Sequence, residues 1–430
     1  MKISFYTLGC KVNQYETQVM RELFEKEGHT VVSDSPDVDV FIINSCTVTA
    51  ESDRKTRQML RKYRSLYKNA VIVLTGCMPQ AFPKDALLLK EADVVAGNTD
   101  AKKIVQLVNR FLQNGERIVD ISKHSRNEKF NTPDISDFDE RTRAFMKIQD
   151  GCDRYCTYCI IPTARGPIRS KPLADILAEA VRLSKKGFKE IVLVGINLTS
   201  YGKDCQEDIN ICDAVEAVCS VDSVLRVRLG SLEPDHISDD MLERLRNQEK
   251  FCPQFHLSLQ SGCDATLKRM NRHYDTAFYK DLVNRIRNRF PDAAITTDIM
   301  VGFAGETKEE FNQSLSFAKE ISFSSAHIFA YSRREGTVAY GLPNQVEKSE
   351  KSRRSRLMIN TTKKSEEQFL DTMVGKTVTV LFESKDSQGK YHGFTGNYCQ
   401  VKADSDENLT GKLIPVKIIA REENYLLGEI

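Results

Sequence analysis

Three cysteines in the middle of the chain have a spacing suited to holding a metal cluster. Cys152, Cys156 and Cys159 stand in a C-x3-C-x2-C pattern directly after the strand-like run Phe145–Ile148. A cubic 4Fe–4S cluster takes one thiolate on each of its irons, so three ligands leave one iron open to bind another molecule. A structural zinc site is the alternative, but such sites usually close with four ligands in paired C-x2-C spacings. No fourth Cys or His stands nearby, and the pattern therefore favours a reactive iron–sulfur cluster.

A second set of three cysteines, Cys10, Cys46 and Cys77, lies upstream in a segment that predicts a parallel α/β sheet. Residues 1 to about 113 alternate short β-rich runs with amphipathic segments, which is typical of a flavodoxin-like fold with strand order 2-1-3-4-5. The expected strands are Ile3–Leu8, Thr30–Ser33, Val38–Asn44, Ala70–Thr75 and Asp93–Ala96, and the expected helices are Tyr15–Glu27, Asp53–Tyr67, Asp85–Glu91 and Ala101–Leu112.

This strand order should bring the second cysteine set together. Cys10, Cys46 and Cys77 follow strands 1, 3 and 4, which are neighbours in the expected sheet. Carboxyl ends of parallel strands, near the reversal of strand order, are where such sheets bind ligands. Three unrelated cysteines are the alternative, since a free Cys often behaves as a small buried hydrophobe. Because all three occupy the same structural position, we expect them to hold a second 4Fe–4S cluster with an open iron.

Beyond a first domain expected at 1–115, the chain divides into four further segments. Residues 116–142 are polar and lack periodicity, which predicts a linker. Residues 143–345 return to a βα alternation, and six parallel strands predict an incomplete (β/α)6 barrel of the TIM type, open on one side. Residues 346–370 predict a connecting helix, and 371–430 predict a small antiparallel β-barrel. The six strands of the central barrel are expected at Phe145–Ile148, Glu190–Val194, Leu225–Leu229, Gln254–Leu259, Ala294–Val301 and Ala326–Tyr331.

Polar residues stand at the strands of this central barrel, whose carboxyl ends are where such barrels gather their active groups. Asn197 follows the second strand and Glu233 the third, Ser258 and Gln260 end the fourth, and Asp298 belongs to the fifth. Each of them taken alone is equally consistent with a turn or a helix cap. We expect the set to contact a cofactor held by Cys152, Cys156 and Cys159.

Charge and composition fit a soluble protein, with a net charge of +2 over 430 residues. The N-terminal run lacks the apolar region of a signal peptide, and no apolar run approaches membrane-spanning length. We therefore expect a cytoplasmic protein without membrane contact, whose cysteines are reduced thiols or metal ligands. With so small a net charge, RNA would have to be held by local patches. Two basic runs qualify, Arg54–Lys68 and Lys351–Lys364, although a solvated helix face is the commoner meaning of such runs.

The C-x3-C-x2-C pattern, with the aromatic Tyr158 before its last cysteine, is similar to that of the radical S-adenosylmethionine superfamily. The resemblance implies that the open iron of this cluster chelates the amino and carboxylate groups of S-adenosylmethionine, which becomes a source of carbon radicals. It also implies contacts to S-adenosylmethionine at the barrel-strand ends, with the backbone at Tyr158 facing the adenine. The side chains expected there are Asn197, Glu233, Ser258, Gln260 and Asp298.

Longer motifs narrow the resemblance to the methylthiotransferases of that superfamily. They are Phe5–Glu16, Ile43–Thr49 and Thr75–Cys77 in the first domain, Gln149–Cys152, Ile160–Gly166 and His256–Gly262 in the barrel, and Gly393–Tyr398 in the last segment, which resembles the RNA-binding TRAM domain. Within the family, Leu8–Asn13 and Gly195–Gly202 look most like the branch that acts on N6-threonylcarbamoyladenosine in tRNA. The isopentenyladenosine branch usually has a Cys-Gln-Met-Asn-like run at its first cysteine, and the ribosomal-protein branch has Cys-Pro-Lys-Asn.

The resemblance implies methylthiolation of C2 of N6-threonylcarbamoyladenosine at position 37, next to the anticodon, in tRNAs that read codons beginning with adenine. No side-chain base removes the weakly acidic C2 proton near neutral pH, so a radical route fits. The cluster on Cys152, Cys156 and Cys159 would make the radical. The cluster on Cys10, Cys46 and Cys77 would hold the sulfur that is methylated and delivered, with one S-adenosylmethionine as methyl donor and another as radical source.

The same resemblance implies tRNA as partner and an electron donor of the flavodoxin or ferredoxin type, while the sulfur source stays open. We expect a monomer. Two alternatives share the chemistry but not the target, which would be isopentenyladenosine in tRNA or an aspartate of a ribosomal protein. A third alternative, from another class of protein, is a non-catalytic iron–sulfur or RNA-binding scaffold.

Overall fold

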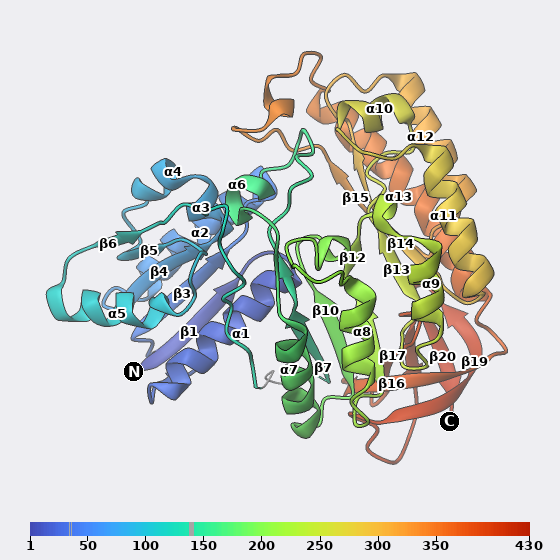
Figure 1. Cartoon of the computed structure of the whole chain (residues 1–430), viewed down its shortest axis with the longest axis horizontal. Coiled ribbons are helices and arrows are strands. Elements are labelled where there is room, and N and C mark those ends of the chain that lie inside the picture. The colour runs from blue at the N-terminus through green and yellow to red at the C-terminus, as the bar shows by residue number, and fades with distance from the viewer. Residues whose placement is uncertain (34, 36, 137–141) are drawn as a thin grey trace.

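A computed structural model describes residues 1–33, 35, 37–136 and 142–430 of the chain (Figure 1). An N-terminal α/β sheet lies beside a central barrel, and a small β-barrel lies at the amino ends of the central strands. This division into sheet, open barrel and terminal barrel confirms the fold class expected from the sequence. Within the described ranges, no helix is long and apolar enough to cross a membrane.

The N-terminal sheet has six parallel strands in the order β2-β1-β3-β4-β5-β6. The first five reproduce the expected order, so β1, β3 and β4 are neighbours as predicted. The sixth strand was not expected and lies past residue 115, inside the predicted linker, where the buried Ile118 pairs with Val94. The strands are β1 (Lys2–Thr7), β2 (Thr30–Val31), β3 (Val40–Ser45), β4 (Val71–Gly76), β5 (Val94–Ala96) and β6 (Ile118–Asp120).

Helices cover both faces of this sheet, and they are α1 (Lys11–Lys26), α2 (Ala50–Leu66), α3 (Cys77–Ala81), α4 (Pro83–Leu87) and α5 (Lys103–Asn114). The helix expected over Asp85–Glu91 is wrong in its limits, because two short helices, α3 and α4, replace it. Phe82 between them has φ −127° and ψ 65°, outside the helical region, and Pro83 opens the second helix. Proline favours the first turn of a helix, since its missing N–H would have no partner there.

The described part of the predicted linker, 116–136, contacts both the N-terminal domain and the central barrel. Ile135 is almost fully buried, and Tyr15 of α1 donates a hydrogen bond to the carbonyl of Pro133 at 3.2 Å. The backbone N–H of Ser136 bonds to Glu22 of α1 at 2.7 Å. Residues 137–141 of the linker lie outside the described residues.

The central barrel is an open one made of two parallel sheets, in the orders β11-β10-β7 and β12-β13-β14-β15. Val227 of β11 forms a parallel bridge with Phe251, which lies in the segment that leads into β13. All six expected strands are present, and a two-residue strand, β12, is added. The strands are β7 (Arg143–Lys147), β10 (Glu190–Val194), β11 (Arg226–Leu229), β12 (Ser231–Leu232), β13 (Gln254–Leu257), β14 (Ala294–Val301) and β15 (Ser325–Ala330), with a small separate pair β8 (Gln149–Asp150) and β9 (Arg169–Ser170).

Amphipathic helices bury their apolar faces on the outside of this barrel. Cys212 and Cys219, on α8, belong to that buried core. The helices are α6 (Ile161–Arg165), α7 (Leu173–Lys185), α8 (Ile211–Cys219), α9 (Asp239–Arg246), α10 (Asp264–Arg269), α11 (Thr276–Arg289) and α12 (Lys308–Ile321), with 3-10 turns η1 (Leu198–Ser200), η2 (Pro234–His236) and η3 (Val338–Gly341).

A single helix, α13 (Lys348–Asp371), runs along β15 and leads into the C-terminal barrel, as expected. Five strands close that barrel in the order β16-β17-β18-β20-β19. The expectation of a wholly antiparallel barrel needs one correction, because β18 and β20 pair parallel to complete the closure. The strands are β16 (Thr377–Lys385), β17 (Tyr391–Thr395), β18 (Gln400–Ala403), β19 (Leu413–Glu422) and β20 (Tyr425–Glu429).

Candidate functional site: two cysteine triads and the network between them

Cys152, Cys156 and Cys159 lie on the loop between β8 and α6, at the carboxyl end of the first barrel strand. The loop is held by backbone hydrogen bonds from Cys152 N–H to the Gly166 carbonyl at 3.1 Å and from Thr157 N–H to the Met270 carbonyl at 3.0 Å. Burial raises the pKa of the Cys152 thiol to about 11 and that of Cys159 to about 12, and the neighbouring cysteines add to both shifts. The loop therefore gathers three thiols that must release protons when they bind a metal.

A buried arginine that sequence reasoning missed, Arg272, ties this loop to the barrel-strand ends. Its guanidinium donates to Cys156 Sγ at 3.4 Å, to the Ser258 carbonyl at 3.0 Å, and to the Glu233 carboxylate in an ion pair. Burial favours a higher pKa for Glu233, and the pKa stays raised despite Arg272 and Arg154. The fixed, planar fork of an arginine suits this role of joining a sulfur, a carbonyl and a carboxylate.

The structure brings most of the predicted cofactor residues toward these cysteines. Glu233 and Ser258 meet Cys156 through Arg272, and Asn197 lies with its Nδ2 4.0 Å from Cys152 Sγ. Tyr158 packs its ring edge-on against Phe303 at 6.3 Å between centroids. Whether these side chains contact S-adenosylmethionine stays a prediction.

Gln260 is the predicted residue whose surroundings fit a ligand best. It is buried with φ 68°, and its backbone bonds to both Asp298 and Met300 of β14. Its side-chain Oε1 is fully enclosed and accepts no hydrogen bond from the described protein. Buried polar atoms are nearly always paired, so an orphan acceptor at a barrel-strand end suits a bound molecule that carries donors.

The second cysteine set converges at the carboxyl edge of the N-terminal sheet, as predicted. Cys10 caps α1 after β1, Cys46 follows β3, and Cys77 opens α3 after β4. Burial raises the pKa of Cys77 to about 12, Arg165 opposes that shift, and both Cys46 and Cys10 add to it. The three thiols therefore lie within electrostatic reach of one another, with Cys10 exposed and the other two buried.

Two glycines permit this close approach. Gly9 precedes Cys10 with φ +119°, and a Cβ there would lie 2.9 Å from the Cβ of Cys46. Gly76 precedes Cys77 with φ +96°, and a Cβ there would lie 2.5 Å from the Ser45 carbonyl oxygen. Both positions need a backbone conformation that residues with a Cβ rarely adopt. Each of these two turns beside a cysteine therefore requires its glycine.

Polar side chains of the quoted motifs fix the same turns. Asn13 Nδ2 donates to the Ser45 carbonyl at 3.0 Å, and Asn44 Nδ2 donates to the Asn13 carbonyl at 2.9 Å. Ser45 Oγ donates to the Thr75 carbonyl at 2.6 Å. These bonds link the three strand ends, so the motif residues hold the cysteines in place.

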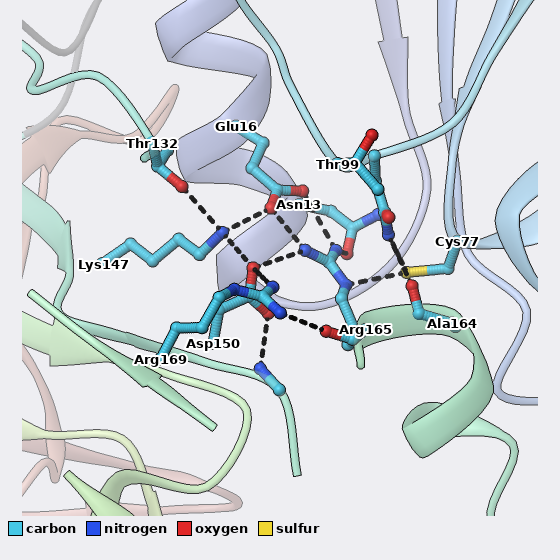
Figure 2. A network of polar contacts seen from close by, with 12 residues as sticks. Asn13, Glu16, Cys77, Thr99, Thr132, Lys147, Asp150, Ala164, Arg165 and Arg169 are labelled. Atoms are coloured by element: carbon cyan, nitrogen blue, oxygen red, sulfur yellow. Dashed lines mark hydrogen bonds and ion pairs between the residues drawn. The ribbon is translucent and has the colours of Figure 1, made fainter. Parts of the chain in front are cut away.

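A buried polar network connects this second set to the barrel (Figure 2). Arg165, at the end of α6 and 1% exposed, donates from Nε to Cys77 Sγ at 3.2 Å and from Nη2 to Glu16 at 3.0 Å. Lys147 bonds to Glu16 at 2.7 Å and to Asp150 at 2.6 Å. Burial alone would raise the pKa of Glu16, but Arg165 and Lys147 outweigh it and lower the pKa. The charges are therefore mutually satisfied across the boundary between sheet and barrel.

Arg165 lies inside the motif Ile160–Gly166, which sequence reasoning quoted without giving that residue a role. Lys147, at the end of β7, gave no signal at all, since a lysine in a strand reads as a solvated residue. Their carboxylate partners Glu16 and Asp150 also lie within quoted motifs. The pairing between the two motifs becomes visible only in the folded chain.

Asp298 lines a cavity of about 650 Å³, whose lining does not include Gln260. Its carboxylate is 3.3 Å from His256 Nε2 and 3.5 Å from His327 Nδ1. Cys10 and Tyr398 line the same cavity, so the N-terminal sheet, the open barrel and the C-terminal barrel all contribute to it. Asp298 as a contact of S-adenosylmethionine stays a prediction, and its partners in the structure are two histidines.

The basic runs are less available to RNA than their sequence indicates. On α2, four arginines each pair with a carboxylate of the same domain, and Arg64 also donates to three backbone carbonyls. On α13, Arg354 is buried against Glu306 at 2.6 Å and so cannot contact a phosphate. The paired arginines of α2 are Arg54 with Glu51, Arg57 with Asp85, Arg61 with Glu91 and Arg64 with Asp93.

Among the described residues, no three His, Cys, Asp or Glu side chains are grouped as they would be around a single metal ion. A cubic cluster places a different iron at each thiolate. The cysteines fit such a cluster because three gather on one loop and three at neighbouring strand ends, with Arg272 beside Cys156 and Arg165 beside Cys77.

Family models match both halves of this arrangement. The model described as the radical SAM superfamily matches residues 146–318, and the model described as uncharacterized protein family UPF0004 matches residues 2–97. The first contains Cys152, Cys156 and Cys159, and the second contains Cys10, Cys46 and Cys77.

Named relatives match over almost their whole length. A threonylcarbamoyladenosine tRNA methylthiotransferase of Bacillus subtilis is 34% identical over 99% of this chain and 96% of the relative. Its namesake in Thermotoga maritima is 37% identical over 98% and 95%. A tRNA-2-methylthio-N(6)-dimethylallyladenosine synthase of Clostridium perfringens is 35% identical over 99% and 96%.

Among solved structures, the radical S-adenosylmethionine methyltransferase TsrM from Kitasatospora setae, with cobalamin and a 4Fe–4S cluster bound, has a TM-score of 0.58 at 13% identity. The match covers 79% of this chain and 76% of that one. At this identity the likeness concerns the fold, and it agrees with an α/β sheet preceding an open barrel.

Proposed function

Because the chain belongs to the radical S-adenosylmethionine methylthiotransferase family, we propose that it methylthiolates C2 of N6-threonylcarbamoyladenosine next to the anticodon of tRNA. The observation that carries the proposal is a buried network that runs from one triad to the residue beside the other. Arg165 bonds to Cys77 and lies 3.6 Å from Asp150, and Asp150 accepts a hydrogen bond from the backbone N–H of Gly151, which precedes Cys152, at 2.8 Å. An enzyme that both makes a radical and delivers sulfur needs two reactive centres in a fixed relation.

The cysteines have separate roles in this proposal. Cys152, Cys156 and Cys159 hold one 4Fe–4S cluster, which also takes S-adenosylmethionine, and Cys10, Cys46 and Cys77 hold the second. When bound, these groups supply a carbon radical, a sulfur atom and a methyl group, which side chains cannot provide. An electron donor of the flavodoxin or ferredoxin type is part of the proposal.

The other residues of the chain bind and orient. Arg272 fixes the cysteine loop against Glu233 and Ser258, and the enclosed Oε1 of Gln260 offers an acceptor to a ligand donor. Asn197 N–H bonds to Gln149 Oε1 at 2.8 Å, and Gln149 in turn holds the carbonyl that precedes Cys152. Second-layer bonds of this kind set ligand orientation and commonly change activity 10- to 100-fold when lost.

Relatives of two substrate names match at similar identity, so the second candidate is the dimethylallyl (isopentenyl) nucleoside of tRNA. The residue after Cys10 favours N6-threonylcarbamoyladenosine over the isopentenyl nucleoside. Lys11 stands there with its side chain on the cavity wall, and the threonylcarbamoyl group carries a carboxylate while the isopentenyl group is neutral.

Nucleoside mass spectrometry of tRNA from a strain lacking this protein tests the proposal. The 2-methylthio derivative of N6-threonylcarbamoyladenosine should disappear and its precursor should accumulate. The wild-type gene should restore the derivative, and a Cys156→Ala copy should not. Loss of the 2-methylthio isopentenyl nucleoside instead would establish the second candidate, and no change in either nucleoside would refute tRNA methylthiolation.

A further inference from the structure

The cavity beside Cys10 has the size and the shared walls of a substrate site. Its volume of about 650 Å³ falls within the range of small-molecule sites, which is about 300–1,000 Å³. Its walls come from the start of α1, from the strands β10, β11, β13, β14 and β15, and from Tyr398 of the C-terminal barrel. A ligand in it would lie against a cysteine of the second triad.

A carboxylate with two histidine partners lies on one side of this cavity. Asp298 lies within ion-pair distance of His256 and His327, and His256 Nδ1 is 3.1 Å from Thr296 Oγ1. A protonated histidine here would have a carboxylate beside it, and a neutral one has hydrogen-bond partners. An anionic ligand is therefore not favoured on this side, where the Asp298 carboxylate already lies beside both histidines.

Lys11 lies on the wall of the same cavity. Among the described residues that line the cavity, it is the only lysine or arginine. Its Nζ lies 5.8 Å from the centre of the Phe145 ring, and no carboxylate of the described chain forms an ion pair with it. The acid within electrostatic reach of Lys11, Glu190, is held by Arg228 at 2.7 Å. A largely enclosed ammonium without a counter-ion is costly, so the site suits an anionic ligand.

We propose that Lys11 binds the carboxylate of the threonyl group on the substrate adenosine, and so selects that nucleoside over one with a neutral N6 substituent. This inference rests on the proposed function. On an adenine ring, N1 lies between C2 and C6, and C6 carries N6. A nucleoside that presents C2 to the centre on Cys10 therefore directs its N6 substituent to neighbouring residues, and the flexible stem of Lys11 lets its ammonium meet a carboxylate there.

Binding measurements separate this role from catalysis. The probes are two anticodon stem-loops, one with N6-threonylcarbamoyladenosine and one with the methyl ester of the same group, measured by fluorescence anisotropy against anaerobically purified holoenzyme. The wild-type protein should bind the acid about 10- to 100-fold more tightly than the ester, as expected for a hydrogen bond to a charged group. Lys11→Gln should bind both alike, and Lys11→Arg should keep a preference for the acid.

Two outcomes overturn the inference. One is equal binding of acid and ester by the wild-type protein, which needs no variant and so does not depend on the folding of Lys11→Gln. The other is an unchanged preference for the acid in a Lys11→Gln protein with wild-type iron content. Either outcome excludes Lys11 as the residue that binds the carboxylate. The proposed function still stands if the strain lacking this protein has lost the 2-methylthio derivative of N6-threonylcarbamoyladenosine. Tighter binding of an isopentenyl stem-loop than of both probes would reject the function itself.

Discussion

Arg165 Nε lies 3.2 Å from Cys77 Sγ, so a residue of the central barrel donates a hydrogen bond to a cysteine of the N-terminal sheet. The same guanidinium bonds to Glu16 and Asn13 of α1. Because all of these groups are buried, the position of the second cysteine triad is tied to the barrel that holds the first.

Replacing Arg165 by methionine should destabilise the protein. The change leaves Glu16 and Asp150 buried with fewer cations, and removing one partner of a buried pair costs about 3–5 kcal/mol. Urea unfolding of the anaerobic protein measures the loss. Arg61→Met is the matched control, because its ion pair with Glu91 is on the surface at 3.4 Å and is worth about 0–1 kcal/mol. Equal effects of the two changes would show that the network contributes no more than a surface pair.

The two cysteine triads should be separable by substitution. Changing Cys10, Cys46 and Cys77 to Ala should roughly halve the iron content and abolish methylthiolation while reductive cleavage of S-adenosylmethionine persists. Changing Cys152, Cys156 and Cys159 to Ala should abolish the cleavage itself. Iron analysis, Mössbauer spectroscopy and assay of 5′-deoxyadenosine check the pair of variants. Intact methylthiolation after loss of the first triad would contradict the proposed division of roles, and zinc in the purified protein would contradict both clusters.

Arg272→Met should impair cleavage of S-adenosylmethionine about 10- to 100-fold, since the residue donates to Cys156 Sγ and orients Glu233. The spectrum of the cluster on Cys152, Cys156 and Cys159 should also change, which a loss of general stability would not produce. Arg287→Met is the control, because the hydrogen bonds of Arg287 within the described part of the chain go to the carbonyls of Ile321 and Ser322 and to no cysteine. A normal spectrum and rate in Arg272→Met would remove the residue from the site.

Tyr398→Ala should loosen the C-terminal barrel from the central one. Arg143 and Arg228 stack on its ring, at 5.1 and 4.6 Å from the ring centre, and desolvated contacts of this kind are worth about 2 kcal/mol. Hydrogen exchange should therefore rise in β17 and at the start of β11. Tyr425→Ala is the control, because Tyr425 stacks with Lys402 inside the C-terminal barrel. Unchanged exchange in Tyr398→Ala would place the docking energy elsewhere, with Arg226 as the next candidate.

Local pattern was enough to predict the main elements and both cysteine triads. Strand periodicity and the rule that parallel strands present their carboxyl ends together placed Cys10, Cys46 and Cys77 at one edge, although they are far apart in the sequence. The misses were the strand β6, the parallel pairing of β18 with β20, and the pair of short helices α3 and α4 around Phe82. These depend on a neighbouring strand or on a single backbone conformation, which a window of sequence does not report.

The sequence by itself determined the chemistry, because the cluster needs particular residue types at particular spacings and those are local properties. Tertiary structure alone decided which charges meet. Arg165 and Arg272 became partners of cysteine sulfurs, the arginines of α2 turned out to be paired with carboxylates of their own domain, and Lys11 came to line a cavity without a counter-ion. Ion pairs and buried hydrogen bonds join residues that are distant along the chain, so their partners are set only when the domains pack.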